Sequence, residues 1–326
     1  MAATMKAVVV HEPGPPDVLA IEDRSVPEPR EDWILIRVKA FGLNRSEIFT
    51  RQGHSPSVSF PRVLGIEALG VVEHSPDPAF RPGDVVATAM GGMGRAFDGG
   101  YAEFVQVPAA QVKHFPDTLD WATLGALPEM IQTAWGALHT GLRAAGEGTL
   151  LIRGGTTSVG LAAAVLARRH GLKVIATTRD PARRSLLIDN GADDVIVDTG
   201  TIAEAARAAV PGGVDYVLEL VGTGTLMDSL ACVRQGGRLC MAGIVGHEWV
   251  LENFAPMFTL PKGVDLTAYV GGADDFVATP HDAFVEEVEA GRARVPMGPV
   301  FEMDGIAEAH RVMESNEARG KVVVLP

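Results

Sequence analysis

The pattern of apolar and polar positions divides the chain into two regions. In the first 120 residues the apolar runs are short and rich in β-branched residues, and proline and glycine clusters separate them. Such runs predict strands and turns rather than long amphipathic helices. We therefore expect a compact, barrel-like or irregular β-domain here. The predicted strands are Lys6–Val10, Ile34–Val38, Gly70–Glu73 and Val85–Ala89.

From about residue 122 onward, strands alternate with helices. Residues 122–145 are rich in alanine and leucine and predict helix, which Gly125 and Pro128 must interrupt. The alternation beyond them is typical of a parallel sheet with helical crossovers. The predicted strands are Thr149–Arg153, Lys173–Thr178, Asp194–Val197, Val214–Leu220 and Arg238–Gly243. The predicted helices are Val159–His170, one from Asp180 to Gly191, one that a capping box of Thr201 and Glu204 begins, and Thr225–Arg234.

After Gly243 the pattern is weaker. It predicts a strand at Asp265–Val270, helices at Pro280–Ala290 and Gly305–Ser315, and a final strand at Lys321–Leu325.

A glycine-bearing turn, Arg153-Gly-Gly-Thr-Thr-Ser-Val-Gly160, joins a predicted strand to a predicted helix. Gly155 suits a tight turn, Gly160 lets the helix pack closely on the sheet, and N–H groups at a helix start attract a pyrophosphate. Thr157 replaces the second glycine of G-x-G-x-x-G, so its side chain either crowds the diphosphate or bonds to it. A plain turn that binds no nucleotide is the alternative. The predicted cofactor-binding residues here are Gly155, Thr156, Thr157, Ser158, Val159 and Gly160.

The end of the next strand favours NADPH over NADH. An NAD site carries a carboxylate there, which binds the ribose 2′-hydroxyl. This chain instead has Thr178 and Arg179, followed by Arg183 and Arg184, while Asp180 is placed to cap a helix. Guanidinium groups bind a 2′-phosphate through paired hydrogen bonds. We expect Thr178, Arg179 and Arg183 to bind the cofactor, and one of Arg183 and Arg184 to be only a solvated residue of the helix.

Charge and composition exclude several classes of protein. The 326 residues include 28 Lys and Arg against 41 Asp and Glu, a formal net charge of −13. So acidic a surface repels phosphate backbones and anionic lipid headgroups, so we expect neither nucleic acid nor membrane as a partner. Because no long uncharged apolar window and no signal peptide is found, we expect a soluble, cytoplasmic protein. Cys232 and Cys240 match no metal or redox motif and are expected to be reduced core thiols.

A series of short motifs runs along nearly the whole chain. They are Met5-Lys-Ala-Val-Val, Gly42-Leu-Asn44 with Arg51-x-Gly53, Gly65-Ile-Glu67 with Gly70-Val-Val72, Arg81-Pro-Gly-Asp84-Val, Asp98-Gly-Gly-Tyr-Ala-Glu103, Gly154–Gly160, Gly191-Ala-Asp193 and Gly320-Lys-Val-Val323. Each motif is loose, but their order and spacing together are specific. The chain resembles the medium-chain dehydrogenase/reductase superfamily, and within it the zinc-independent quinone oxidoreductase group that includes the zeta-crystallins.

The resemblance implies an α/β fold of two domains. One is a chaperonin-10-like β-domain of residues 1–121, completed by residues 292–326. The other is a Rossmann domain, a doubly wound parallel sheet over residues 122–291. In this family the active site lies in the cleft between the two domains. The implied fold agrees with the strand and helix pattern.

The resemblance also bears on metal chemistry. Zinc-dependent relatives bind the catalytic metal with Cys, His and Cys, and the matching positions here are Asn44, Ile66 and Glu129. One carboxylate cannot replace three protein ligands of zinc. Where the relatives have a structural four-cysteine lobe, Met90–Gly100 contains no cysteine. We therefore expect no metal, which favours reduction of a conjugated acceptor over alcohol dehydrogenation.

The resemblance assigns two catalytic residues, Asn44 and Thr133. Asn44 faces the nicotinamide and can offer its amide to the acceptor oxygen, and Thr133 contacts the cofactor. Asn44 could instead be only a turn residue, and the Thr133 hydroxyl could bond within its own helix. Lys321 resembles a cofactor-facing position, although a surface lysine at a strand end is equally compatible. Further cofactor contacts are expected from Val221 and Gly222 at the adenosine and from Gly243, Ile244 and Val245 at the nicotinamide.

A proton donor is not evident in the sequence. Several quinone oxidoreductases carry tyrosines near the substrate, at positions where this chain has Phe49 and Ser55. We expect Arg51 and Glu47 to form a structural ion pair and Glu67 to be a buried structural carboxylate.

The sequence thus favours an NADPH-dependent reductase of quinones or α,β-unsaturated carbonyls that works without zinc. An enoyl-thioester reductase and a non-enzymatic, crystallin-like NADPH-binding protein are the alternatives. The resemblance also implies a homodimer, in which edge strands around Leu260–Val270 pair across a two-fold axis.

Overall fold

The computed structural model describes residues 3–326, which form two compact units. The first unit contains the chain up to Gln132 together with Gly271–Pro326, and the second is Thr133–Val270. The predicted boundaries, at 121/122 and 291/292, differ from this division, because residues 122–132 and 271–291 belong to the first unit. The predicted first domain also begins with residues 1 and 2, which lie outside the described residues.

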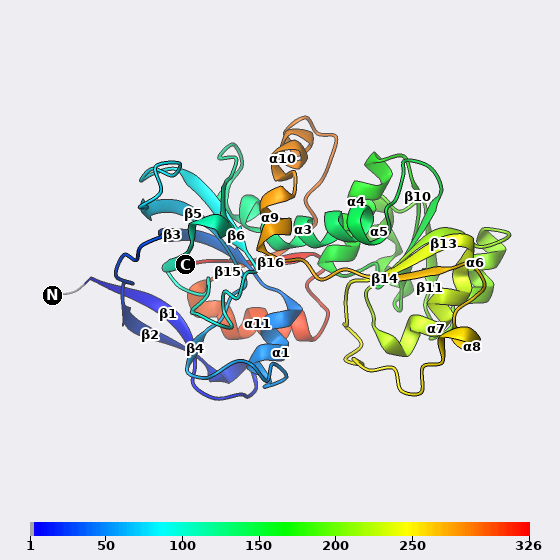
Figure 1. The fold of residues 1–326 in the computed structure, drawn as a ribbon, viewed down its shortest axis with the longest axis horizontal. Helices are drawn as coiled ribbons and strands as arrows, with labels where there is room; N and C mark the ends of the chain where they lie inside the picture. Colours follow the sequence, from blue (N-terminus) through cyan, green and yellow to red (C-terminus); the bar gives the residue numbers. More distant parts are fainter. Residues whose placement is uncertain (1–2) are drawn as a thin grey trace. The chain divides into compact units, whose positions relative to one another are not determined.

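The first unit is built on two sheets (Figure 1). The smaller has the strand order β2-β1-β4, and the larger has the order β15-β16-β3-β5-β6-β8, with β7 also paired to β3. Their strands are β1 (Thr4–Val10), β2 (Leu19–Ser25), β3 (Trp33–Gly42), β4 (Arg62–Val63), β5 (Glu67–His74), β6 (Val85–Ala89), β7 (Phe104–Pro108), β8 (Val112–His114), β15 (Met297–Glu302) and β16 (Lys321–Leu325).

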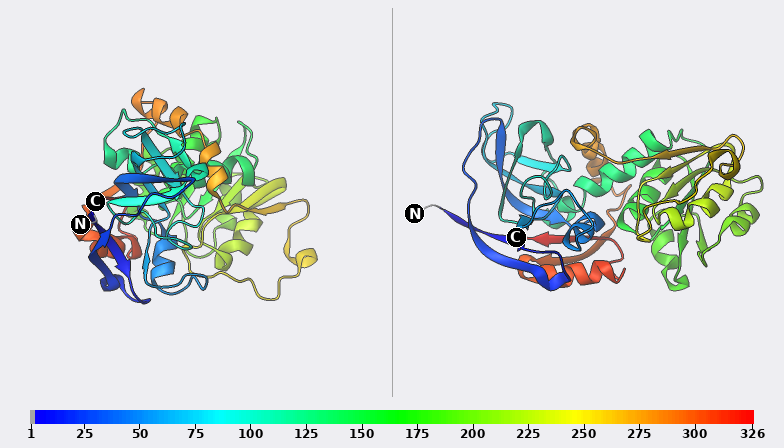
Figure 2. Two further views of the ribbon diagram at one scale, coloured as in Figure 1. Left: turned by 60° about the vertical axis from the view of Figure 1, so that its left-hand side comes forward. Right: turned by 60° about the horizontal axis from the view of Figure 1, so that its bottom comes forward.

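The C-terminal strand completes the larger sheet, as predicted. Strand β16 runs antiparallel to β3, with Val323 opposite Gly42 and Val324 opposite Phe41, and parallel to β15. Figure 2 shows this red strand beside blue and cyan strands of the N-terminal region. The sheet therefore brings Lys321 to the end of β3, next to the start of the first helix.

Helices of the first unit surround these sheets. They are α1 (Arg45–Arg51), α2 (Trp121–Gly125), α3 (Pro128–Gly136, which continues into the second unit), α9 (Ala273–Ala278), α10 (His281–Glu289) and α11 (Ile306–Glu314). The predicted interruptions are confirmed, because α2 ends at Gly125 and α3 begins at Pro128. A Cβ on Gly125 would lie 2.4 Å from that of Ala40, so α2 packs directly on β3.

The second unit is a six-stranded parallel sheet of order β11-β10-β9-β12-β13-β14. The order reverses between β9 and β12, as in a doubly wound Rossmann sheet. Right-handed crossovers place α4 and α5 on one face and α6 and α7 on the other, which Figure 1 shows for α4 and α7. The strands are β9 (Thr149–Arg153), β10 (Lys173–Thr178), β11 (Asp194–Val197), β12 (Val214–Glu219), β13 (Val233–Met241) and β14 (Asp265–Ala268).

The helices of this unit are α4 (Ser158–Arg169), α5 (Arg184–Asp189), α6 (Ala203–Ala209), α7 (Thr223–Cys232) and α8 (Pro256–Thr259), with a π-helical turn at Ala137–Gly141. The predicted capping box at Thr201 is wrong. Helix α6 begins at Ala203, and Ile202 and Ala203 donate their N–H groups to the carboxylate of Asp228. The predicted helix Thr225–Arg234 is also shifted, because α7 ends at Cys232 and β13 begins at once.

Cys232 and Cys240 are buried free thiols, as predicted. None of the helices in residues 3–326 combines the length and the apolar character that a membrane span needs.

Candidate functional site

The predicted phosphate-binding turn joins β9 to α4 in the second unit. Gly154 has a φ of +84°, so this glycine, rather than Gly155, adopts the left-handed conformation of the turn. Gly155 serves a different need, because a Cβ there would lie 2.9 Å from the Cβ of Ala176 on β10. The N–H of Gly154 donates to Oγ1 of Thr177 at 3.1 Å. Gly154 was not among the predicted cofactor-binding residues, although the two adjacent glycines were a signal for it.

The side chain of Thr157 forms hydrogen bonds within the turn itself. Its Oγ1 donates to the carbonyl of Gly154 at 2.8 Å and accepts from the N–H of Gly160 at 3.0 Å. The hydroxyl therefore caps α4 and closes the turn. A Cβ on Gly160 would lie 2.7 Å from the Gly154 carbonyl, so no side chain fits there. Ser158 and Val159 begin the helix, where N–H groups have no intrahelical partner and the helix dipole favours an anion.

The adenosine end of the predicted site lies after β10. Thr178 is buried, and its hydroxyl bonds to both the carbonyl and the N–H of Asp180. Asp180 in turn accepts from the N–H of Ala182, which confirms the predicted helix cap. Arg179 is exposed, and Arg183 lies 3.6 Å from Asp180.

Arg184 bonds to residues of the neighbouring strand β11. It donates to Oδ1 of Asp194 at 2.9 Å and to the carbonyl of Val195 at 3.0 Å. These bonds favour Arg184 as the solvated residue of the helix, and the cofactor roles of Arg179 and Arg183 stay predictions.

The other predicted cofactor residues follow β12 and β13. Oε1 of Glu219 accepts from the N–H groups of Val221 at 2.6 Å and Gly222 at 3.2 Å, which fixes the loop after β12. After β13 come Gly243, Ile244 and Val245. The Val245 N–H donates to the Leu220 carbonyl at 3.1 Å, and a Cβ on Gly243 would lie 2.8 Å from that same oxygen.

The carboxyl ends of β9, β10, β12 and β13 therefore bring the predicted residues to one edge of the parallel sheet, where dinucleotides bind in this architecture. Glycine turns, free helix N–H groups and nearby arginines fit a phosphorylated dinucleotide.

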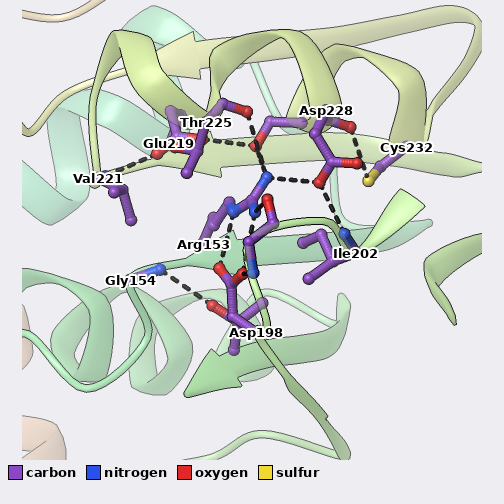
Figure 3. A network of polar contacts seen from close by, with 12 residues as sticks. Arg153, Gly154, Asp198, Ile202, Glu219, Val221, Thr225, Asp228 and Cys232 are labelled. Carbon is purple, nitrogen blue, oxygen red and sulfur yellow. Dashed lines mark hydrogen bonds and ion pairs between the residues drawn. The ribbon is translucent and has the colours of Figure 1, made fainter. Parts of the chain in front are cut away.

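Arg153, the last residue of β9, joins the loops of this edge (Figure 3). Its buried guanidinium donates to both carboxylate oxygens of Asp198, at 2.8 and 3.0 Å, and to Asp228 at 2.7 Å. It also donates to the carbonyls of Gly200 and Thr225 and to the Ser229 hydroxyl, which itself donates to Glu219. Burial lowers the pKa of Arg153, but its carboxylate partners outweigh that effect and raise it. The sequence signal was a charged residue directly after three apolar residues of a predicted strand.

A second buried polar cluster lies in the first unit and contains predicted catalytic Asn44. Lys321 Nζ lies 2.5 Å from Oδ1 of Asn44, 2.6 Å from Oε1 of Glu67 and 3.3 Å from Oε2 of Glu129. Lys321 and Glu67 are fully buried, so the alternative of a surface lysine is wrong. Burial lowers the pKa of Lys321, but Glu67 and Glu129 outweigh it and raise that pKa.

The side chain of Asn44 is committed within this cluster. Asn44 precedes α1 as its N-cap residue, but its side chain does not cap the helix. Its amide donates instead to Oε1 of Glu67 at 2.9 Å and to Oε1 of Glu47 at 3.2 Å. Both amide hydrogens are therefore used in the described structure, and an acceptor oxygen could bind Asn44 only by displacing a carboxylate.

Glu47 is the titratable member of the cluster. Burial raises its pKa to about 7, although the N–H of Ile66, 3.1 Å from Oε1, and the charge of Lys321 favour its ionised form. The predicted ion pair of Arg51 with Glu47 is wrong, because the ion-pair partner of Arg51 is Glu314 on α11. Glu67 is a buried carboxylate, as predicted.

The positions that match zinc ligands do not fit a metal. Asn44 and Glu129 both contact the ammonium of Lys321, whose charge opposes a cation, and the third position is the apolar Ile66. Among residues 3–326, no group of three or more His, Cys, Asp or Glu side chains could hold a metal ion.

Thr133 lies half-buried on α3 and belongs to the second unit, whereas Asn44 belongs to the first. The catalytic roles of these two residues stay predictions.

Comparisons with known proteins agree with this architecture. The family described as "Alcohol dehydrogenase GroES-like domain" matches residues 30–117, and the family described as "Zinc-binding dehydrogenase" matches residues 190–324. The quinone oxidoreductase of Sus scrofa is 30% identical over 332 residues, which cover 98% of both chains. The acryloyl-coenzyme A reductase of Sulfurisphaera tokodaii is 26% identical over 352 residues and covers 99% of this chain and 100% of its own.

A solved mycobacterial structure, a complex with NADPH, has a TM-score of 0.87 and 27% identity and covers 99% of this chain and 100% of its own. The fold and the matches define an oxidoreductase of the medium-chain dehydrogenase/reductase type. Within that superfamily, the chain belongs to the quinone oxidoreductase group.

Proposed function

We propose that this protein is an NADPH-dependent reductase that transfers a hydride to a quinone or an α,β-unsaturated carbonyl without zinc. The observation that carries the proposal is the set of residues at one edge of the parallel sheet. A capped glycine turn lies there, and the residue directly after β10 is Arg179 rather than a carboxylate. When bound, NADPH supplies the hydride. The chain's own residues bind the pyrophosphate at Gly155–Gly160 and the 2′-phosphate at Arg179 or Arg183.

Two further observations support the proposal. The quinone oxidoreductase relatives match along almost the whole chain. The cluster around Lys321 places an ammonium among the residues that match zinc ligands, so polarisation of an alcohol by a metal is not available there. An activated, conjugated acceptor needs no such polarisation, because its carbon already accepts a hydride and its oxygen can take a proton from water.

The test is NADPH and NADH oxidation, followed at 340 nm, with a benzoquinone, a naphthoquinone and a simple enone, each with and without a chelator. We expect turnover that prefers NADPH and does not change with the chelator. Loss of activity on chelation, or turnover only with NADH, would contradict the proposal. NADPH binding without turnover of any acceptor would instead favour the non-enzymatic, crystallin-like role.

A second candidate is reduction of an enoyl thioester, which the similarity to an acryloyl-coenzyme A reductase favours. A thioester substrate would need a basic surface for its nucleotide end. Arg51 and Arg62 are not available for such a surface, because Arg51 is buried against Glu314 and Arg62 donates to Asp98 at 2.9 Å. Acryloyl-CoA and crotonyl-CoA belong in the same panel, and faster turnover of these than of quinones would favour this candidate.

We also propose that two chains form a dimer through the edge of the parallel sheet. Strand β14 is the last strand in the order of that sheet. In the chain segments just before and after this strand, the side chains of Met257, Phe258 and Val270 are 92%, 95% and 88% exposed. Exposed large apolar side chains and an open strand edge are each typical of a surface that a partner covers. A second copy would extend the sheet across a two-fold axis.

A further inference from the structure

Asp198 places a carboxylate next to the proposed 2′-phosphate site. It follows β11 directly, and its N–H donates to the carbonyl of Thr178 at 2.8 Å, which continues the pairing of β10 with β11. Arg179 is the next residue after Thr178. Burial raises the pKa of Asp198, but hydrogen bonds from Arg153 and the Gly200 N–H, together with the charges of Arg153 and Arg179, lower it. A negative charge here opposes a phosphate, as carboxylates in NAD-specific sites do.

Arg153, at the end of β9, pairs with the carboxylate of Asp198. Its Nε and Nη2 bind the two oxygens of Asp198 as a fork, at 2.8 and 3.0 Å (Figure 3). The Arg153 side chain is fully buried and that of Asp198 is 10% exposed, so water screens the pair poorly. The guanidinium therefore offsets the charge of Asp198, and it also holds the carboxylate turned toward β9.

We propose that Arg153 is a specificity-determining, positioning residue: by pairing with Asp198, it keeps the end of β10 able to accept the 2′-phosphate of NADPH. Arg153 itself does not touch the phosphate in this scheme. The inference rests on the proposed function, because it presumes that the cofactor carries a 2′-phosphate.

Asp228 provides a matched control within the same network. Its carboxylate also pairs with Arg153, at 2.7 Å from Nη1, but it lies on α7 and accepts from the N–H groups of Ile202 and Ala203. It has no hydrogen bond to β10 among the described residues. Removal of its charge perturbs the same guanidinium without changing the charge next to Thr178.

The experiment measures the dissociation constants of NADPH, NADH, 2′,5′-ADP and 5′-AMP by calorimetry on the full chain at low salt. We expect Asp198→Asn to bind NADPH and 2′,5′-ADP about threefold more tightly, with NADH and 5′-AMP unchanged. Arg153→Gln should weaken NADPH relative to NADH about tenfold, and adding Asp198→Asn to it should restore most of that preference. Asp228→Asn should leave the ratio of NADPH to NADH affinity at the wild-type value.

Three results would overturn the inference. They are equal weakening of all four ligands by Arg153→Gln, failure of Asp198→Asn to restore the preference, and equal effects of Asp198→Asn and Asp228→Asn. Circular dichroism and thermal unfolding report whether each variant folds, and if Arg153→Gln does not fold, the comparison of Asp198→Asn with Asp228→Asn decides the question alone. A wild-type chain without preference for NADPH would overturn the proposed cofactor and this inference together, and that result is visible before any variant is made.

Discussion

The Nζ of Lys321 lies 2.6 Å from Oε1 of Glu67, and neither side chain reaches solvent. The lysine lies on β16, the C-terminal strand of the chain, and the glutamate lies on β5. Gly42 lies against both side chains. A Cβ on Gly42 would lie 2.5 Å from Glu67 Oε1, so a side chain at this position would displace the ion pair. The ion pair thereby fastens the C-terminal strand to the N-terminal part of the same unit.

Lys321→Met should destabilise the protein strongly, because it leaves Glu67 and Glu129 buried without their cation. Breaking a buried ion pair by removing one partner costs about 3–5 kcal/mol. Urea unfolding at neutral pH measures the loss. Lys321→Met combined with Glu67→Gln should recover part of it, since the second change removes the unpaired charge. Equal stabilities of wild type and Lys321→Met would show that the pair contributes nothing.

Glu47→Gln should change how stability depends on pH. Burial raises the pKa of Glu47 from 4.5 to about 7, so the folded state holds a proton that the unfolded state has lost between these values. The free energy of unfolding of the wild type should therefore fall by about 3 kcal/mol from this group as pH rises from 4.5 to 7. Glu47→Gln should lack that fall and be the more stable protein at pH 8.

Unfolding curves at several pH values check this prediction. Exposed Glu31→Gln is the control and should follow the wild type. A wild-type curve that does not fall between pH 4.5 and 7 relative to Glu47→Gln would contradict the raised pKa.

Gly160→Ala should impair the dinucleotide turn. The new methyl would lie 2.7 Å from the Gly154 carbonyl and 2.9 Å from the Gly155 carbonyl, and neither backbone group can move without opening the turn. We expect a loss of about 1–3 kcal/mol in stability and at least about tenfold weaker NADPH binding, a 1.4 kcal/mol effect. Calorimetric titration measures the affinity. Gly272→Ala is the control, because its nearest neighbour would lie 3.6 Å away.

Arg179→Asp should separate the two nicotinamide cofactors. It replaces a cation at the end of β10 with an anion, so NADPH affinity should fall about 10- to 100-fold while NADH affinity changes little. Parallel titrations with both cofactors measure the difference. Arg184→Gln should spare both affinities, since Arg184 bonds to Asp194 and Val195. An equal fall for NADPH and NADH would refute the assignment of the 2′-phosphate to Arg179. Arg183→Gln would then be the next variant.

Phe258→Asp should yield monomers if the parallel sheet pairs with a second copy. The side chain is 95% exposed in the single chain, so the change should not disturb the fold, yet it would place a charge in an apolar contact. Light scattering of wild type and variant measures the mass. Ile21→Asp, on strand β2 of the other unit and 40% exposed, is the control. A monomeric wild type would refute the dimer.

The sequence predicted best those parts of the fold in which neighbouring residues specify the structure. Strands β9 and β10, the cap at Asp180 and the interruption at Pro128 all follow from local pattern. Strand β15 was missed because its residues are half-buried or exposed and show no apolar alternation. The predicted cap at Thr201 was wrong because the N–H of Ile202, at the start of α6, donates to the carboxylate of Asp228, 26 residues further along the chain.

The candidate site shows the same limit. The glycine turn and the arginines after β10 are contiguous and could be found by spacing. The partners of Lys321 could not, because Asn44 and Glu129 lie 277 and 192 residues from it in the chain. The pairing of β16 with β3 brings Lys321 to Asn44, and α3 adds Glu129, so no local signal reports these contacts.

The Arg153 network also constrains how this sequence can diverge in evolution. Asp198 and Asp228 lie 45 and 75 residues from Arg153 in the chain, yet each depends on the same guanidinium (Figure 3). A replacement at position 153 leaves both carboxylates without their buried partner, at a cost of several kcal/mol. Neutral drift at these three positions is therefore coupled, and descendants that lose the arginine should have replaced its acids as well. We therefore expect substitutions at positions 153, 198 and 228 to occur together, although these positions are far apart in the chain.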